Sequence, residues 1–188
     1  MSLDIIPELI LWFILPAWIV AGFLDWACHR RAHIDEHCGP WETLFHLLLL
    51  AEAGTAVSLG LFLELNEPVL AIIALCFVAH EITVYVDVWY AHPRRNISPA
   101  EQRVHDFMTA MPVAALFLIA VLHWPDLKNM VTEPSRIWTE GLKPKTNPLP
   151  ITQVISVLAA VTIGNLVPYF EELWRGVRFL RRNRAARR

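Results

Sequence analysis

Cysteine is scarce in this sequence of 188 residues, and its spacing is uninformative. Cys28, Cys38 and Cys76 are an odd number without a Cys-x-x-Cys spacing, which argues against both a disulfide framework and a thiolate zinc site. The chain also has no P-loop, no GGDEF sequence and no other nucleotide or flavin motif. These absences argue against a nucleotide enzyme, and we expect the cysteines to be packing residues.

Long apolar segments make up most of the chain. With 55% hydrophobic residues and a mean hydropathy of +0.41, the sequence is too apolar for an ordinary soluble domain. Five stretches are long enough to cross ~30 Å of hydrocarbon as helices. They are Ile5 to Cys28, Trp41 to Leu65, Pro68 to Tyr90, Val104 to Trp124 and Leu149 to Leu173. The sequence thus predicts an all-α, polytopic membrane helix bundle, with a transmembrane domain at 1–174 and a basic cytoplasmic tail at 175–188.

The first segment does not have the pattern of a cleaved signal peptide. It opens with Asp4 and Glu8 instead of basic residues, and it is longer than the apolar region of a signal peptide. We therefore expect it to remain in the protein as a membrane helix.

Basic residues gather at alternate ends of the predicted helices. One set comprises Arg30, Arg31, Arg94, Arg95, Arg103 and the seven arginines from Arg175 to Arg188. The other set comprises Lys128, Arg136, Lys143 and Lys145. The positive-inside rule then places the amino terminus outside and the carboxyl terminus in the cytoplasm, and we expect a bacterial inner membrane. The arginine tail is interpreted as a topology anchor that touches anionic lipid, so no nucleic-acid partner is expected.

Histidines and carboxylates recur together toward one end of the apolar segments. Side chains four residues apart share a helix face. This spacing relates Asp25 to His29 and His33, Glu42 to His46, and Glu101 to His105, while His80 and Asp87 lie two turns apart. Ionisable groups inside a membrane are costly unless they are paired or bound, so such a cluster is by default a functional site.

Imidazole and carboxylate groups together predict a metal site surrounded by four of the helices, because they are ligands of iron, zinc and manganese. The number of such groups suits two ions, since a single structural zinc needs only four ligands. The expected metal ligands are Asp25, His29, His33, His46, His80, Asp87 and His105. Additional ligands, or partners of the ligating imidazoles, are expected among Glu42, His92, Glu101 and Asp106. Near the midplane, Glu52 and Glu81 are the candidate catalytic carboxylates.

Other polar residues have simpler explanations. We expect His37 to be solvated in a loop and His123 to make a structural hydrogen bond. Asn165 inside the last segment is interpreted as a helix-packing residue. Glu42, Glu101 and Asp106 also lie near predicted helix starts, where an acid can stabilise the helix dipole without binding a metal.

The His29-x-x-x-His33 motif at the cytoplasmic end of a membrane helix, with further histidines after later helices, resembles the membrane diiron families. These are the fatty-acid hydroxylases, desaturases and alkane monooxygenases. The resemblance implies two irons, dioxygen activation and oxidation of a lipid, with His29 and His33 as ligands. The HxxHH motifs of those families are missing here, and carboxylates take the place of several histidines. The chain is also similar to small polytopic proteins of bacterial inner membranes.

The leading functional hypothesis is a dinuclear, preferably diiron, oxidoreductase that acts on a lipid or another apolar small molecule. Membrane lipid is then a partner, and electrons must come from an external donor, because no flavin or nucleotide motif is present. A zinc hydrolase of lipid amides or esters is an alternative, with Glu52 or Glu81 as general base. Two further alternatives are a divalent-metal transporter and a haem-binding electron carrier that uses His46, His80 and His105.

Overall fold

The computed structural model describes residues 5–186, and Asp4, Arg187 and Arg188 lie outside this range. The described chain is all-α, as predicted. Its helices are α1 (Ile5–Leu9), α2 (Leu15–Arg31), α3 (Ile34–His37), α4 (Pro40–Phe62), α5 (Glu67–Ala91), α6 (Pro99–Leu122), α7 (Trp124–Thr132), α8 (Ile151–Val161) and α9 (Val167–Ala186). Two π-helical turns, Ile10–Ile14 and Thr162–Leu166, join α1 to α2 and α8 to α9 into continuous rods.

Within the described residues, five helical units are long and apolar enough to cross a membrane. They are Ile5–Arg31, Pro40–Phe62, Glu67–Ala91, Pro99–Leu122 and Ile151–Ala186. The five predicted spans are therefore confirmed as helices of sufficient length, as expected for a multi-pass membrane protein. The kind of membrane and the orientation of the chain in it stay predictions.

The outer surface of the bundle is apolar. Large side chains such as Leu75, Tyr85, Trp89 and Phe117 are each about two-thirds exposed or more (68%, 73%, 70% and 66%). At the same time several histidines and acids are buried inside. Extended apolar surface of this kind marks contact with another apolar phase, and here it suits surrounding lipid.

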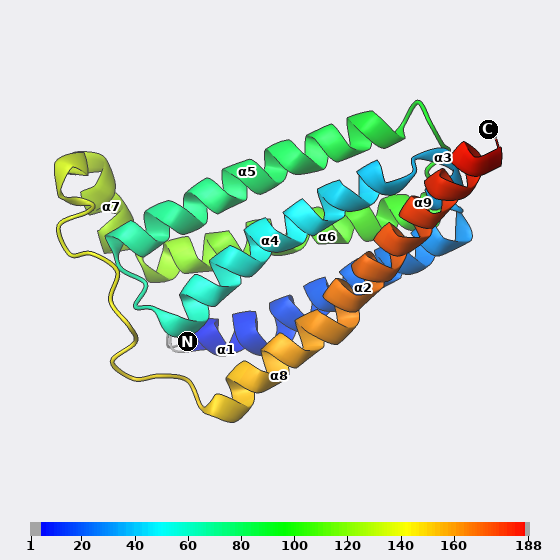
Figure 1. Cartoon of the computed structure of the whole chain (residues 1–188). Coiled ribbons are helices and arrows are strands. Elements are labelled where there is room, and N and C mark those ends of the chain that lie inside the picture. Colours follow the sequence, from blue (N-terminus) through cyan, green and yellow to red (C-terminus); the bar gives the residue numbers. More distant parts are fainter. Residues whose placement is uncertain (1–4, 187–188) are drawn as a thin grey trace.

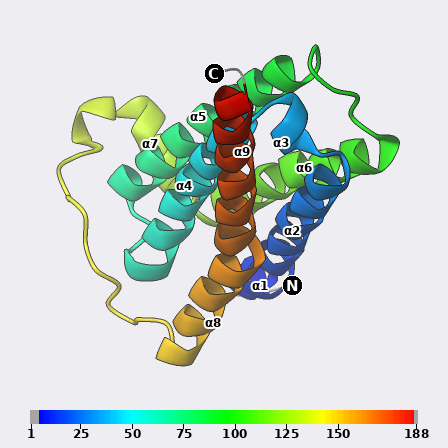
Figure 2. The same cartoon turned by 45° about the vertical axis from the view of Figure 1, so that its right-hand side comes forward.

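The helices run along a common direction, with the amino-terminal end of the chain at one end of the bundle and α3 and the end of α9 at the other (Figure 1). Helices α4 and α5 pack as an antiparallel pair, and α2 packs against α6. The last rod crosses the others obliquely, so that α9 lies against α4 and α3 (Figure 2). This crossing brings a fifth helix to the end of the bundle where the predicted ligands lie.

Polar side chains cap the starts of two helices. The Ser98 hydroxyl accepts a hydrogen bond from the Glu101 N–H at 3.2 Å, and Pro99 occupies the first turn of α6. Asn66 caps α5 by accepting from the Val69 N–H at 3.4 Å. These caps fix where α5 and α6 begin. They therefore also fix how far the polar residues on these helices lie from the ends of the bundle.

Three segments outside the predicted spans are helical. The segment after the fourth span begins with the nine-residue helix α7, which has Pro125 in its first turn. The linker between the first two spans contains the short helix α3. The helix of the fifth span continues past Leu173 through the basic tail to Ala186, and Arg175 in α9 forms ion pairs with Asp35 and Glu171.

Gly176 sets the close approach of α9 to the start of α4. A Cβ atom at this position would lie 2.9 Å from the backbone nitrogen of Pro40 and 3.0 Å from the carbonyl carbon of Gly39. Gly39 itself has φ = 64° and ψ = −149°, which a side chain would strain. Glycine at both positions therefore lets the two backbones touch.

We expect Gly176→Ala to destabilise the protein, although alanine normally stabilises a helix by up to about 1 kcal/mol relative to glycine. The added methyl group would push α9 away from α4. Gly54→Ala is the matched control, because a Cβ there meets nothing within 4 Å. In thermal unfolding in detergent, the two substitutions should change the melting temperature in opposite directions. Equal shifts would contradict the proposed backbone contact.

Candidate metal centre

A cluster of buried polar side chains lies between the helices near α3. We call it the polar cluster and define it as Asp25 and His29 from α2, Glu42 and His46 from α4, Asp87 from α5, Glu101 and His105 from α6, and Glu172 from α9. Seven of these residues are buried, and the His105 side chain is 19% exposed. Five helices contribute, one more than the sequence predicted.

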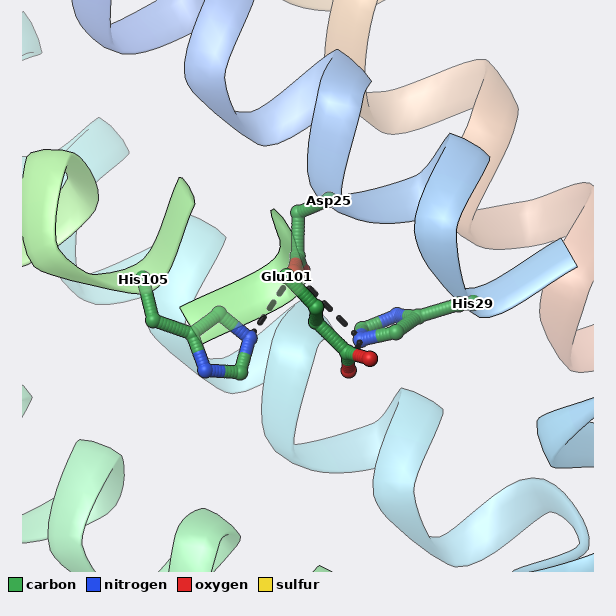
Figure 3. Close-up of side chains that lie close together, drawn as sticks. All are labelled: Asp25, His29, Glu101 and His105. Atoms are coloured by element: carbon green, nitrogen blue, oxygen red, sulfur yellow. Dashed lines mark hydrogen bonds and ion pairs between the residues drawn. The ribbon is translucent and has the colours of Figure 1, made fainter. Parts of the chain in front are cut away.

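The first group of possible ligands consists of Asp25, His29, Glu101 and His105 (Figure 3). Each offers one ligand atom, and these atoms all lie within 4.8 Å of one another. His29 Nε2 lies 3.2 Å from Glu101 Oε1 and 3.4 Å from Asp25 Oδ1, and His105 Nε2 lies 2.9 Å from the same Asp25 oxygen. Small shifts of these side chains would bring two nitrogens and two oxygens around one ion.

The second group consists of His29, Glu42 and His46. The two imidazole rings are stacked, with centroids 4.6 Å apart and planes 15° from parallel. Glu172 lies alongside both rings: its Oε2 is 3.3 Å from His29 Nδ1, and its Oε1 is 3.1 Å from His46 Nδ1. The Thr43 hydroxyl donates to Glu172 Oε1 at 2.8 Å. His29 thus lies between the two groups, with its opposite ring nitrogens facing different carboxylates.

Arg95 closes the end of the polar cluster. It comes from the turn between α5 and α6, and its Nη2 lies 2.5 Å from both Glu42 Oε1 and Glu101 Oε1. Burial alone would lower the pKa of Arg95, but the hydrogen bonds to the two carboxylates raise it above its ordinary value. The guanidinium is therefore a permanent cation here. The sequence predicted Arg95 only as a marker of topology.

The charges and unpartnered atoms of the polar cluster fit bound cations. Five carboxylates against the one guanidinium leave four negative charges, which two divalent ions would balance while the imidazoles stay neutral. Within residues 5–186, both ring nitrogens of His29, together with Glu172 Oε2 and Asp87 Oδ1, are buried and make no hydrogen bond of good geometry, although the His29 nitrogens lie 3.2–3.4 Å from carboxylate oxygens. Buried polar atoms and charges are costly when left unpaired. The nitrogen and oxygen donors suit iron, zinc or manganese.

Asp87 extends the polar cluster toward the middle of the bundle, where a second polar contact lies. Asp87 Oδ2 is 3.4 Å from His46 Nε2. Earlier in α5, His80 Nδ1 lies 3.7 Å from Glu52 Oε2. The Thr83 hydroxyl donates a hydrogen bond to Glu52 Oε1 at 2.9 Å. His80, expected as a metal ligand, therefore lies beside Glu52 and belongs to neither ligand group. The other candidate catalytic acid, Glu81, is half-buried, and its Oε1 has no partner in the described chain.

The expectation that His33 continues the helical face of Asp25 and His29 was wrong. Helix α2 ends at Arg31, and His33 adopts a left-handed conformation (φ = 50°) before α3. Its side chain is exposed and separate from the ligand groups. The row of possible ligands on this helix face therefore ends at His29.

His92 and Asp106 also lie outside the polar cluster. Both side chains are exposed. His92 follows the last residue of α5, while Asp106 accepts hydrogen bonds from Gln102 and Arg103 on the outside of α6. Of the four additional candidates, Glu42 and Glu101 are thus the two that the fold brings to the polar cluster.

Glu172 is the member of the polar cluster that the sequence prediction missed. It is fully buried, whereas its neighbour Glu171 faces the Trp26 Nε1–H at 3.0 Å and Arg30 at 2.6 Å. The sequence does contain a pattern that indicates its position. Helical spacing puts Glu172 on the same face as Asn165, Tyr169 and Gly176. The Asn165 amide and the Tyr169 hydroxyl donate to the Ile19 and Gly22 carbonyls and so fix α9 against α2.

The cysteines are free thiols in the structure. Cys38 lies between α3 and α4, and burial, together with a hydrogen bond to Glu42, raises its pKa to about 12. Since only the thiolate is a good metal ligand, Cys38 is not suited to bind an ion at neutral pH. This agrees with the nitrogen and oxygen ligand set of the polar cluster.

Comparison of the chain with protein-family models, with curated proteins and with solved structures finds no match. Fold and site alone therefore define its class. Over residues 5–186 it is an all-α protein with five helices long and apolar enough to span a membrane, and it has buried groups of histidine and carboxylate residues that could hold a metal ion.

Proposed function

We propose that this chain is a metal-dependent membrane oxidoreductase with two metal ions, preferably iron, in the polar cluster. Its substrate is a lipid or another apolar small molecule. The observation that carries the proposal is the convergence of Asp25, His29, Glu101 and His105, each with one ligand atom within 4.8 Å of the others. We place the polar cluster on the cytoplasmic side of a bacterial inner membrane, because it lies at the arginine-rich ends of the helices and the positive-inside rule assigns such ends to the cytoplasm.

The residues divide naturally between two ions. Asp25, His29, Glu101 and His105 would hold the first. Glu42 and His46 from the second group would hold the second ion, with Asp87 beside His46, and Glu172, which lies beside both His29 and His46, is positioned between the two ions. Mixed histidine and carboxylate ligands are typical of iron sites that keep positions open for dioxygen. When bound, the iron would supply the activation of dioxygen.

The protein's own residues hold these ligands in place. Arg95 holds Glu42 and Glu101 from one side, and Thr43 orients Glu172 from another. Hydrogen bonds of this kind fix a ligand's direction and tune the metal. The surrounding helices exclude water from His29, whose side chain has no exposed surface, and an apolar substrate can approach from the lipid. Electrons come from an external donor.

A zinc hydrolase is the second candidate, because a set of two histidines and two carboxylates is also suited to a single zinc ion. In that case Glu172 or Glu42 would be the nearest spare carboxylate to act as general base. The two candidates differ in the metal that supports activity and in the response to dioxygen.

The test is to load the purified protein with ferrous iron without oxygen and then to expose it to air. We expect a new near-ultraviolet or visible absorption band to appear. Protein loaded with zinc is the matched control, because zinc is not redox active and should give no band. If iron binds but dioxygen causes no spectral change, the oxidoreductase proposal fails, and hydrolysis of lipid esters by the zinc-loaded protein becomes the activity to measure.

A further inference from the structure

A second site lies in the half of the bundle away from α3. A partly open cavity of about 390 Å³ is lined by α2, α4, α5 and α6 together with the first turns of the chain. Most of its wall is apolar, with Leu11, Trp18, Val57, Phe77 and Leu116 among the lining residues. Its volume falls within the range of small-molecule binding sites. At the opposite end from His80 the rim carries charged side chains, including Glu8, Glu64 and Lys145.

Two polar atoms without partners lie at the inner end of this cavity. Glu52 Oε2 and His80 Nδ1 are both buried, and the 3.7 Å between them is too long for a hydrogen bond. The other Glu52 oxygen is occupied by the Thr83 hydroxyl, and the Trp18 ring packs edge-on against His80 with centroids 5.9 Å apart. The pair is thus held in place with one free hydrogen-bonding atom on each residue.

We propose that the cavity binds a long-chain alcohol, with its hydroxyl group between Glu52 and His80 and its chain along the apolar wall. A hydroxyl group can donate to one atom and accept from another, so a single group can serve both residues. A fatty-acid anion would place its negative charge beside Glu52, and an alkane would leave both atoms unpaired. The alcohol is therefore the occupant that the cavity fits best.

This site is separate from the polar cluster. His80 and Glu52 belong to neither ligand group, and Thr83 stands one helical turn before Asp87 on α5. The inference rests on the cavity alone and holds whether or not the polar cluster binds metal. A failure of the metal proposal and a failure of this one are thus distinguishable.

The experiment measures binding of radiolabelled 1-dodecanol to the full-length protein in nanodiscs, with empty nanodiscs as background. We expect saturable binding of dodecanol and binding at least about tenfold weaker for both dodecanoate and dodecane. A tenfold difference corresponds to about 1.4 kcal/mol, which is within the range for one hydrogen bond.

Two matched glycine substitutions on α4 test where the alcohol binds. A Cβ atom at Gly60 or at Gly54 would meet nothing within 4 Å, so neither site is blocked by a neighbour. Gly60 lines the cavity, whereas Gly54 lines a separate shallow depression. Gly60→Leu should weaken dodecanol binding about tenfold or more, while Gly54→Leu should leave it unchanged.

Glu52→Gln tests how the head group is recognised. The amide can donate a hydrogen bond to a carboxylate, so this variant should lose most of the preference for dodecanol over dodecanoate. Three results would overturn the proposal: dodecanol binding that does not saturate, equal effects of the two glycine substitutions, or dodecane binding as tightly as dodecanol. The last would mean an apolar cavity that does not recognise a hydroxyl group.

Discussion

His29→Ala is expected to abolish metal binding almost completely. His29 belongs to both ligand groups: its Nε2 faces Asp25 and Glu101, and its Nδ1 faces Glu172. Removal of the imidazole therefore takes one metal-binding donor from each group. It also leaves the buried carboxylates to repel one another. Elemental analysis of the detergent-purified variant gives the metal content per chain, and size-exclusion chromatography checks that it is still folded.

His33→Ala is the informative control for this experiment. His33 is only four residues away and is the second residue of the motif that resembles diiron proteins, but it is exposed after the end of α2. The His33→Ala variant should therefore bind as much metal per chain as the unmodified protein. Full metal content in folded His29→Ala, or an equal loss in His33→Ala, would contradict the assignment of the ligand groups.

Arg95→Gln should be the most destabilising substitution of a charged residue outside the ligand groups. It removes the cation that Glu42 and Glu101 share, and breaking a buried ion pair in this way costs about 3–5 kcal/mol. The loss should be smaller when metal is bound, because divalent ions supply positive charge to the same carboxylates. Thermal unfolding in one detergent, with and without metal, measures both effects.

Arg94→Gln is the matched control for Arg95. The neighbouring arginine is exposed, and its guanidinium lies against the carbonyl and ring of Tyr90. Its substitution should change stability little, because exposed interactions of charged residues contribute about 0–1 kcal/mol. If the Arg95 and Arg94 variants unfold at the same temperature, Arg95 does not neutralise the polar cluster as described.

Hydropathy predicted the membrane-spanning helices well, because length and apolar composition are properties of each segment alone. Their ends were predicted less well. The extension of α9 through the tail could not be read from hydropathy, since it depends on contacts such as the ion pair of Arg175 with Asp35. The helix α7 was missed because its sequence contains an early proline and lacks a long apolar stretch.

The spacing of four residues correctly brought together the pairs Asp25–His29, Glu42–His46 and Glu101–His105, because helix geometry alone puts such residues on one face. It failed for His33, where the helix ends first. Glu172 and Arg95 could not be placed by spacing. Glu172 reaches the polar cluster through the contact of Gly176 with Gly39, and Arg95 reaches it because the turn after α5 places its guanidinium beside Glu42.

The metal positions themselves provide the most direct measurement. We predict that an anomalous-scattering map from crystals of the iron-loaded protein will show a peak about 2 Å from ligand atoms of Asp25, His29, Glu101 and His105. A second peak is expected beside His46 and Glu172. Iron bound only at exposed histidines such as His33 or His92, with no peak among the five helices, would contradict a metal centre in the polar cluster.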